Sequence, residues 1–424
     1  MRRSLVVTVA VLLLASSCGH APSGATTTAS NLAKPPGVVS STAPTVDTSS
    51  GSSALTGLGI SVAVMGKGAY VSYDPTGAIR FTAAAGLLSG DRHQLISAVV
   101  DGGQTFVDWT DPSTGQRRTR RAVPGTLSLA AVSFSGHKVA LADASYPSPL
   151  SGELAAGRLK SHIVVVSEGD TPLITRTLDG NLVPEAFTEG RDLVAMIEYL
   201  PADHPTKYRV RLLDLSAGQL MAPFKWNTKE PLDETMAGLR GSYVVTEGGR
   251  FLYTLYRADN GTAFVHALGL DIGTQHCIDL PADVGLGKGT GSIAASVDGR
   301  QLYVLTSTGK LVTIDTNTQL DQPTDPAVAK VTDLGQISTT GRPALAVNAR
   351  VLYAGLDDHL VTVDLTSGTI SQSSIGQVAT ALAISPTAHA VLAANDTSIW
   401  RLHSRDAPVR LPGTLGSVEM VMSV

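Results

Sequence analysis

An all-β fold built from repeated units is predicted by three features of the sequence from about residue 55 to residue 424. Short apolar runs rich in Val, Ile, Leu and Tyr recur along this region. Gly, Asp, Asn and Ser separate the runs, and no stretch sustains a helical period over three turns. Many short strands with closely spaced turn signals are typical of a sandwich, a barrel or a propeller, and the repeats discriminate among these.

The repeated unit is clearest in three segments near the C-terminal end, which are residues 293–315, 345–368 and 382–402. Each has the order strand, tight turn, strand, polar turn, strand, and Asp298-Gly299 or Ser385-Pro386 supplies the first turn. More divergent copies lie around residues 130–134, 186–215 and 244–270. The spacing of about 36 to 56 residues is in the range of propeller blades. Because a four-stranded blade cannot bury both faces alone, we expect the copies to stack radially.

The two ends of this region together supply the strands of one repeated unit. Residues 417–424 look like the first strand of a further unit, and residues 60–81 look like the second to fourth strands of a unit that lacks its first. Joining them forms one blade from both ends and removes the open edges that would otherwise pair with other chains. The sequence therefore predicts a single β-propeller of seven or eight four-stranded blades. The count favours eight, and residues 87–121 are the least regular part.

The N-terminal residues 1–17 are typical of a secretory signal peptide. Met1-Arg2-Arg3 is cationic, residues 5–15 are apolar apart from Thr8, and small residues precede Cys18. The apolar run is too short to span a bilayer, which takes roughly 20 residues. We therefore interpret this segment as a leader for export and not as a transmembrane helix.

The segment Leu14-Ala15-Ser16-Ser17-Cys18 resembles a bacterial lipobox, with Ala15 where the usual motif has leucine. The resemblance implies that the Cys18 thiol receives a diacylglycerol with chains such as palmitate. Stable anchoring generally takes two acyl chains, at about 0.8 kcal/mol per buried methylene, and a diacylglyceryl group supplies both. Cys18 is thus the predicted lipidation site, which places the protein on the extracytoplasmic face of the cell membrane. An ordinary signal peptide with an incidental cysteine is the alternative.

Residues 18–54 are mostly Ala, Ser, Thr, Pro and Gly and have no hydrophobic period. Such a segment cannot bury enough apolar surface to offset the entropy lost on ordering. We expect a disordered tether between the lipid anchor and the propeller domain at 55–424.

Composition excludes some partners. A net charge of −4 and a pI of about 6.2 give no electrostatic footprint for nucleic acid or an anionic membrane surface. We interpret the basic cluster Arg117–Arg121 as a solvated strand edge and not as a binding patch.

With Cys18 acylated we expect no intrachain disulfide, and we interpret Cys277 as a small buried strand residue. The predicted protein is a monomer whose partners are the membrane, through the anchor, and a protein or glycan.

Catalytic and metal-binding motifs are few. The ten histidines have no His-x-His or His-Glu-x-x-His spacing, and His204 and His266 are isolated, which favours core or surface roles. No nucleophile elbow, Walker loop or dinucleotide fingerprint is present. We therefore predict no catalytic, metal or cofactor-binding residues and no cofactor.

Acidic residues from different blades could still gather in the central channel of a propeller. The candidates are Glu185, Glu198, Asp233 and Glu234. Solvated carboxylates in loops and turns are the simpler interpretation. One sequence does not decide whether these side chains converge.

The segment Ser296–Val304 resembles the repeat of YVTN and WD40-like propellers, whose turns have Pro-Asp-Gly before a Leu-Tyr-Val strand. The hairpins Leu213–Gly218 and Val363–Gly368 are similar to quinoprotein-type repeats, although the tryptophans and the vicinal cysteine pair of those proteins are missing. The chain is therefore similar to the scaffolding propellers of bacterial envelope lipoproteins. The resemblance implies a membrane-anchored, non-catalytic module that binds a protein, peptide or glycan. The alternative is a cell-envelope hydrolase, lyase or lactonase with a site in the central channel.

Overall fold

The computed structural model describes residues 58, 60–143, 154–188, 190–225, 235–258, 261–271, 273–284, 286, 291–316, 327–335, 343–385, 390–402 and 408–424. The predicted signal peptide, Cys18 and the tether lie outside the described residues, as do Asp233 and Glu234. Within the described part of the chain, no helix is long and apolar enough to cross a membrane.

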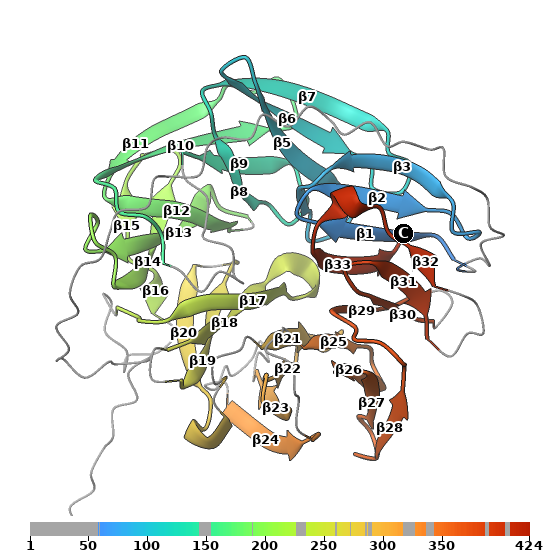
Figure 1. Ribbon diagram of the computed structural model, residues 1–424. Coiled ribbons are helices and arrows are strands. Elements are labelled where there is room, and N and C mark those ends of the chain that lie inside the picture. The colour runs from blue at the N-terminus through green and yellow to red at the C-terminus, as the bar shows by residue number, and fades with distance from the viewer. Residues whose placement is uncertain are drawn as a thin grey trace, which may run out of the picture.

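Eight sheets are arranged in a ring, with one strand of each nearest the centre (Figure 1). Blade 1 consists of β33 (Val418–Ser423), β1 (Val62–Gly66), β2 (Ala69–Tyr73) and β3 (Ile79–Ala84). Blade 2 consists of β4 (Leu87–Leu88), β5 (Leu95–Asp101), β6 (Gln104–Thr110) and β7 (Arg117–Pro124). Blade 3 consists of β8 (Ser128–Val132), β9 (Lys138–Ala142), β10 (Lys160–Ser167) and β11 (Ile174–Asp179). Blade 4 consists of β12 (Asn181–Phe187), β13 (Leu193–Leu200), β14 (Lys207–Asp214) and β15 (Leu220–Met221).

The second half of the ring repeats this plan. Blade 5 consists of β17 (Leu239–Val245), β18 (Phe251–Arg257), β19 (Ala263–Gly269) and β20 (Thr274–Asp279), and β16 (Phe224–Lys225) adds a parallel fifth strand beside β20. Blade 6 consists of β21 (Ser292–Ala295), β22 (Gln301–Leu305), β23 (Lys310–Asp315) and β24 (Ala327–Asp333). Blade 7 consists of β25 (Ala344–Val347), β26 (Val351–Leu356), β27 (His359–Asp364) and β28 (Ile370–Ser374). Blade 8 consists of β29 (Ala381–Ile384), β30 (Val391–Ala394), β31 (Ser398–Arg401) and β32 (Val409–Arg410). Three short 3-10 turns are η1 (Glu247–Gly249), η2 (Ala282–Val284) and η3 (Gly413–Leu415).

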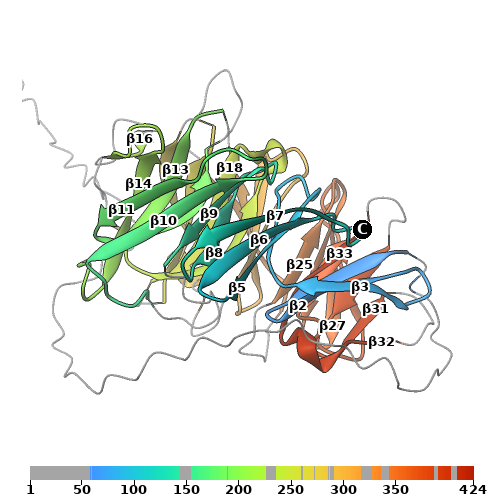
Figure 2. The same cartoon turned by 90° about the horizontal axis from the view of Figure 1, so that it is seen from above.

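The ring is closed as predicted, by the C-terminal strand in the N-terminal blade. β33 pairs antiparallel with β1, so that Val421 lies opposite Val64 and Ser423 opposite Val62. The two ends of the described chain lie side by side in both views (Figures 1 and 2). The prediction of a propeller with eight blades is confirmed, and the irregular region 87–121 is blade 2.

The turns that identify the repeats in the sequence share one hydrogen bond in the structure. In four blades the first hairpin is closed by a backbone N–H that donates to a hydroxyl five residues earlier, at 2.9 to 3.1 Å. These bonds join Gln94 to Ser89, Lys138 to Ser133, Phe251 to Thr246 and Gln301 to Ser296. Hydroxyls of this kind satisfy backbone groups that a tight turn leaves unpaired. This local bond explains why the repeat is visible in the sequence.

Three blades meet at Phe134, in the β8–β9 hairpin. Its ring packs against Gly90 of blade 2 and Gly249 of blade 5, and a Cβ at either glycine would overlap it. Gly249 also has a φ of +69°, which favours glycine. The η1 turn that contains Gly249 lies near the centre of the ring (Figure 1). The Phe134 ring thus joins blades 2, 3 and 5.

Cys277 lies in β20, as expected of a strand residue, and is partly buried against the core between blades 4 and 5. Its sulfur is 3.7 Å from the Met236 sulfur. The expectation of no intrachain disulfide depends on Cys18, the other cysteine of the sequence, which lies outside the described residues.

Candidate functional site

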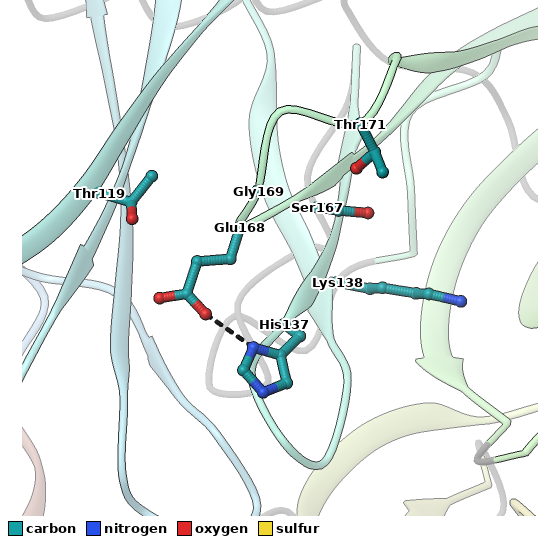
Figure 3. Close-up of a pocket in the computed structure, with 7 residues that line it drawn as sticks. All are labelled: Thr119, His137, Lys138, Ser167, Glu168, Gly169 and Thr171. Carbon is teal, nitrogen blue, oxygen red and sulfur yellow. Dashed lines mark hydrogen bonds and ion pairs between the residues drawn. The ribbon is translucent and has the colours of Figure 1, made fainter.

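A groove of about 570 Å³ lies between blades 2 and 3 (Figure 3). Its walls come from β7, from the β8–β9 hairpin and from the end of β10 with the loop that follows. The lining residues are Thr119, His137, Lys138, Ser167, Glu168, Gly169 and Thr171. Hydroxyl, imidazole and carboxylate groups therefore line one hollow, which we call the blade 2/3 groove, whereas the Lys138 ammonium points away and pairs with Asp192 at 2.6 Å.

Glu168 organises the blade 2/3 groove. Its carboxylate lies 2.7 Å from the His137 Nδ1 atom and accepts a hydrogen bond of 3.1 Å from the Gln94 side chain of blade 2. Its backbone N–H donates to the His137 carbonyl at 2.9 Å. The His137 side chain remains 66% exposed, and its second ring nitrogen points away from Glu168 (Figure 3). The groove thus presents an oriented imidazole to solvent.

Arg121 of β7 holds the far wall of the groove in place. Its guanidinium donates to the carbonyls of Ser167 at 3.1 Å and Thr171 at 3.0 Å, and also to that of Gly169. Hydrogen bonds from a charged donor are stronger than neutral ones, and these join blade 2 to blade 3. No pattern in the sequence indicates this role of Arg121, because the acceptors are carbonyls about 50 residues away.

The rest of the basic cluster is paired within blade 2. Arg120 makes two hydrogen bonds of 2.6 and 2.7 Å to Asp108, and Arg117 lies 3.9 Å from the same carboxylate. Arg118 donates to Asp111 at 2.9 Å. These partners agree with the interpretation of the cluster as a strand edge.

The structure separates the predicted acidic residues. Glu185 lies in β12 and faces blade 5, where its Oε1 is 3.7 Å from the Arg240 Nε of β17. Glu198 lies in β13 and accepts a hydrogen bond of 2.6 Å from Arg209 in β14 of the same blade. Glu198 and Tyr199 point to opposite faces because adjacent strand residues alternate, and Tyr199 belongs to the core that faces blade 5. Glu185 and Glu198 therefore do not converge, and the simpler interpretation of solvated loop carboxylates is wrong for both, because they lie in strands with side chains 0% and 13% exposed.

Arg240 was not among the residues predicted from the sequence. One signal could have found it: its strand is otherwise free of charged residues, with the sequence Leu-Arg-Gly-Ser-Tyr-Val-Val. An ionisable residue in an inner strand needs a buried partner. The partner itself lies in another blade, so that no spacing in the sequence indicates it.

The two isolated histidines occupy a surface position and a core position, as expected. His204 is 87% exposed and its Nδ1 lies 3.0 Å from its neighbour Asp203. His266 of β19 is 1% exposed in the core, and burial lowers its pKa from 6.5 to about 4. Across the described residues, no three His, Cys, Asp or Glu side chains lie in a group that could hold a metal ion.

The pKa of His266 makes a pH dependence of stability expected. Between pH 6.5 and 4 the unfolded chain binds a proton at this imidazole and the folded chain does not, so stability falls as the pH falls. The difference of about 2.5 pKa units corresponds to about 3 kcal/mol. In His266→Leu, urea unfolding at a series of pH values should show a loss of unfolding free energy between pH 6.5 and 4 that is smaller than in the wild type by about 3 kcal/mol. His204→Leu is the control, and equal slopes in His266→Leu and the wild type would contradict the assignment.

No family model matches the sequence, and no curated protein matches it. Several solved structures share its fold at low identity. The apo form of AztD from Citrobacter koseri has a TM-score of 0.41 and 13% identity, over 76% of this chain and 96% of that one. NirN, a dihydro-haem d1 dehydrogenase, has a TM-score of 0.46 and 16% identity, over 86% and 75% of the two chains. The Dos1 propeller has a TM-score of 0.45 and 12% identity, over 74% of each chain.

These neighbours differ from one another in name and activity, as is usual for a fold that hosts many functions. At such identities and TM-scores they indicate the fold and carry no argument about a shared ligand or reaction. The chain is an eight-bladed β-propeller, and its function has to be argued from its own residues.

Proposed function

We propose that this protein is an extracytoplasmic lipoprotein, acylated at Cys18, whose propeller is a non-catalytic binding module for a protein, peptide or glycan. The observation that carries the binding part is the blade 2/3 groove. Hydroxyl groups of Thr119, Ser167 and Thr171 stand beside the oriented imidazole of His137 in one open hollow. Peptides and glycans are recognised through such hydrogen-bonding groups on a pre-formed wall.

Rigidity of the groove supports recognition of an external partner. The Arg121 bonds to three carbonyls and the Gln94 bond to Glu168 tie the two blades together behind the groove. A wall that is already ordered loses little entropy when it binds. The lipid anchor and the tether of residues 18–54 would present this wall at a distance from the membrane.

A disulfide to Cys277, the other cysteine of the sequence, would be a competing fate for the Cys18 sulfur. A sulfur atom in a thioether to glycerol cannot also form a disulfide. The lipoprotein proposal therefore requires diacylglycerol on the Cys18 peptide. Non-reducing mass spectrometry of the membrane-extracted protein tests it, and a peptide that links Cys18 to Cys277 would overturn the anchor.

A variant that fills the groove tests the binding proposal. We expect Thr119→Trp to recover at least tenfold less crosslinked partner than the wild type when the tethered protein is crosslinked and isolated from membranes. The matched control is Thr175→Trp, an exposed residue of β11 in blade 3, which should recover the partner normally. Equal recovery by both variants would exclude the groove, and stoichiometric bound metal without a protein or glycan partner would favour the enzymatic alternative.

A further inference from the structure

The Glu168 carboxylate in the blade 2/3 groove uses only one of its two oxygens within the described chain. Its Oε2 atom lies 2.7 Å from the His137 Nδ1 atom and accepts the hydrogen bond of 3.1 Å from the Gln94 side chain. Its Oε1 atom accepts no hydrogen bond from a described residue and points away from His137 (Figure 3). The Glu168 side chain is 19% exposed. Glu168 therefore contributes one open acceptor to the wall of the groove.

The contact with Glu168 determines which nitrogen of His137 is an acceptor. A carboxylate that already accepts from Gln94 has no hydrogen of its own to donate, so the hydrogen in the 2.7 Å contact is on the His137 Nδ1 atom. In a neutral imidazole, the other nitrogen then carries a lone pair and no hydrogen. The Nε2 atom of His137 is thus a second acceptor, on a side chain that is 66% exposed.

Three hydroxyl groups add to these two acceptors. Thr119, Ser167 and Thr171 line the groove, and none of their hydroxyls is hydrogen-bonded to another described residue. A hydroxyl oxygen can accept as well as donate. The groove therefore suits a ligand that carries several hydrogen-bond donors on one atom.

The cations near the groove are engaged by other groups. Lys138 pairs with Asp192 and points away from the hollow (Figure 3), and Arg121 donates to three backbone carbonyls. In the part of the chain that the structure describes, no lysine or arginine forms an ion pair with Glu168. A carboxylate without a countercharge attracts cations and repels anions. The groove therefore favours a cationic ligand.

An ammonium group matches these acceptors better than a guanidinium does. It carries three hydrogens and a positive charge, and it has no lone pair that would need a donor. A guanidinium binds a carboxylate best through two parallel hydrogen bonds, one to each oxygen. The Oε2 atom of Glu168 is already occupied by His137 and Gln94, so that only a single oxygen is available to a ligand.

The depth of Glu168 favours an ammonium on a flexible stem. Glu168 is 19% exposed, whereas the neighbouring His137 side chain is 66% exposed and Thr171 is exposed as well. The carboxylate thus lies below the side chains that surround it. A lysine side chain carries its ammonium on a flexible four-carbon stem and can reach past them, while an amino sugar holds its ammonium directly on a bulky ring.

We propose that the blade 2/3 groove recognises a lysine side chain of a protein or peptide partner. The lysine ammonium donates to the Glu168 Oε1 atom, to the His137 Nε2 atom and to a hydroxyl of the wall. This inference rests on the proposed function, because it names the group of the partner that the binding module contacts. An acetylated lysine would be rejected, since it lacks the charge and has one N–H in place of three.

Ligand-detected NMR titration of the full chain with the blocked tripeptide acetyl-Ala-Lys-Ala-amide tests the proposal. This peptide should bind at least about tenfold more tightly than the same peptide with an acetylated lysine, because acetylation removes the charge-assisted hydrogen bonds. Glucosamine, whose ammonium is attached to a sugar ring, should bind more weakly than the lysine tripeptide. These comparisons change only the ligand, so that they do not depend on the folding of a variant.

Glu168→Gln should weaken the binding of the lysine tripeptide by at least about tenfold. The new amide can keep its oxygen toward His137 and Gln94, and it then places an NH2 donor where the Oε1 acceptor was. Asp170→Asn is the matched control. It removes one negative charge from the same loop, at an exposed residue outside the lining of the groove, and should change the affinity by less than about twofold.

No binding of the lysine tripeptide by the wild type would overturn the assignment to lysine. So would equal binding of the acetylated peptide, tighter binding of glucosamine, normal binding by Glu168→Gln, or an equal loss in Asp170→Asn. The proposal that the groove binds a partner is tested separately, by the crosslinked partner that Thr119→Trp recovers. A groove that loses its partner in Thr119→Trp but does not distinguish the two tripeptides would bind through another group.

Discussion

The Cys18→Ala variant is expected to leave the membrane and accumulate in the soluble exported fraction. The change removes the sulfur that would carry the diacylglyceryl group. Each buried methylene contributes about 0.8 kcal/mol, so that the loss of two chains removes almost all membrane affinity. Nothing in the net charge of −4 offers a second attachment to an anionic lipid surface. Fractionation of cells followed by immunodetection measures the shift.

Cys277→Ala is the control for this experiment, because it removes the other cysteine of the sequence. It should stay in the membrane fraction as the wild type does. Retention of Cys18→Ala in the membrane would show that the anchor proposal is wrong. The result is independent of the binding proposal for the groove, which concerns the folded propeller.

Val421→Asp is expected to destabilise the propeller by at least about 4 kcal/mol, since it buries an unpaired carboxylate. Val421 is 4% exposed in β33, opposite Val64 of β1, and belongs to the core between blades 1 and 8. Because β33 closes the ring, its loss would also expose the edge of β1 to pairing with other chains. We expect calorimetry to show a lower melting temperature than that of the wild type, with aggregation of the unfolded protein.

Met420→Asp is the matched control: it makes the same substitution at the preceding residue of the same strand. Met420 is 37% exposed, so the new carboxylate keeps contact with water and should change stability by less than about 1 kcal/mol. Equal melting of the two variants would mean that β33 does not hold the ring closed.

Local patterns made most of the fold predictable. The Ser296-Val-Asp-Gly299 turn and the Asp214 to Gly218 turn are determined by bonds within five residues, and the structure contains them. The shared blade was predictable because an open edge is unfavourable wherever the chain ends. The least regular region, 87–121, formed a blade nonetheless, since Ile96, Val107 and Trp109 pack against blade 3.

The candidate sites were predictable only in part. Glu185 was recognised as a candidate, but its partner Arg240 was not, because it comes from the next blade. Glu198 was grouped with Glu185 although alternation along β13 turns it to the opposite face. The groove pair His137 and Glu168 is 31 residues apart and has no spacing motif.

The sequence by itself determined an all-β ring of seven or eight blades closed by the C-terminal strand, and the structure established that the blades are eight. Hydrophobic alternation and turn residues act over a few residues, and the stacking of equal blades follows from them. Only the tertiary structure decided which charges meet. Glu185 and Arg240 are brought together by two bulges in neighbouring blades, and a bulge depends on how complete sheets pack, which no short stretch of sequence specifies.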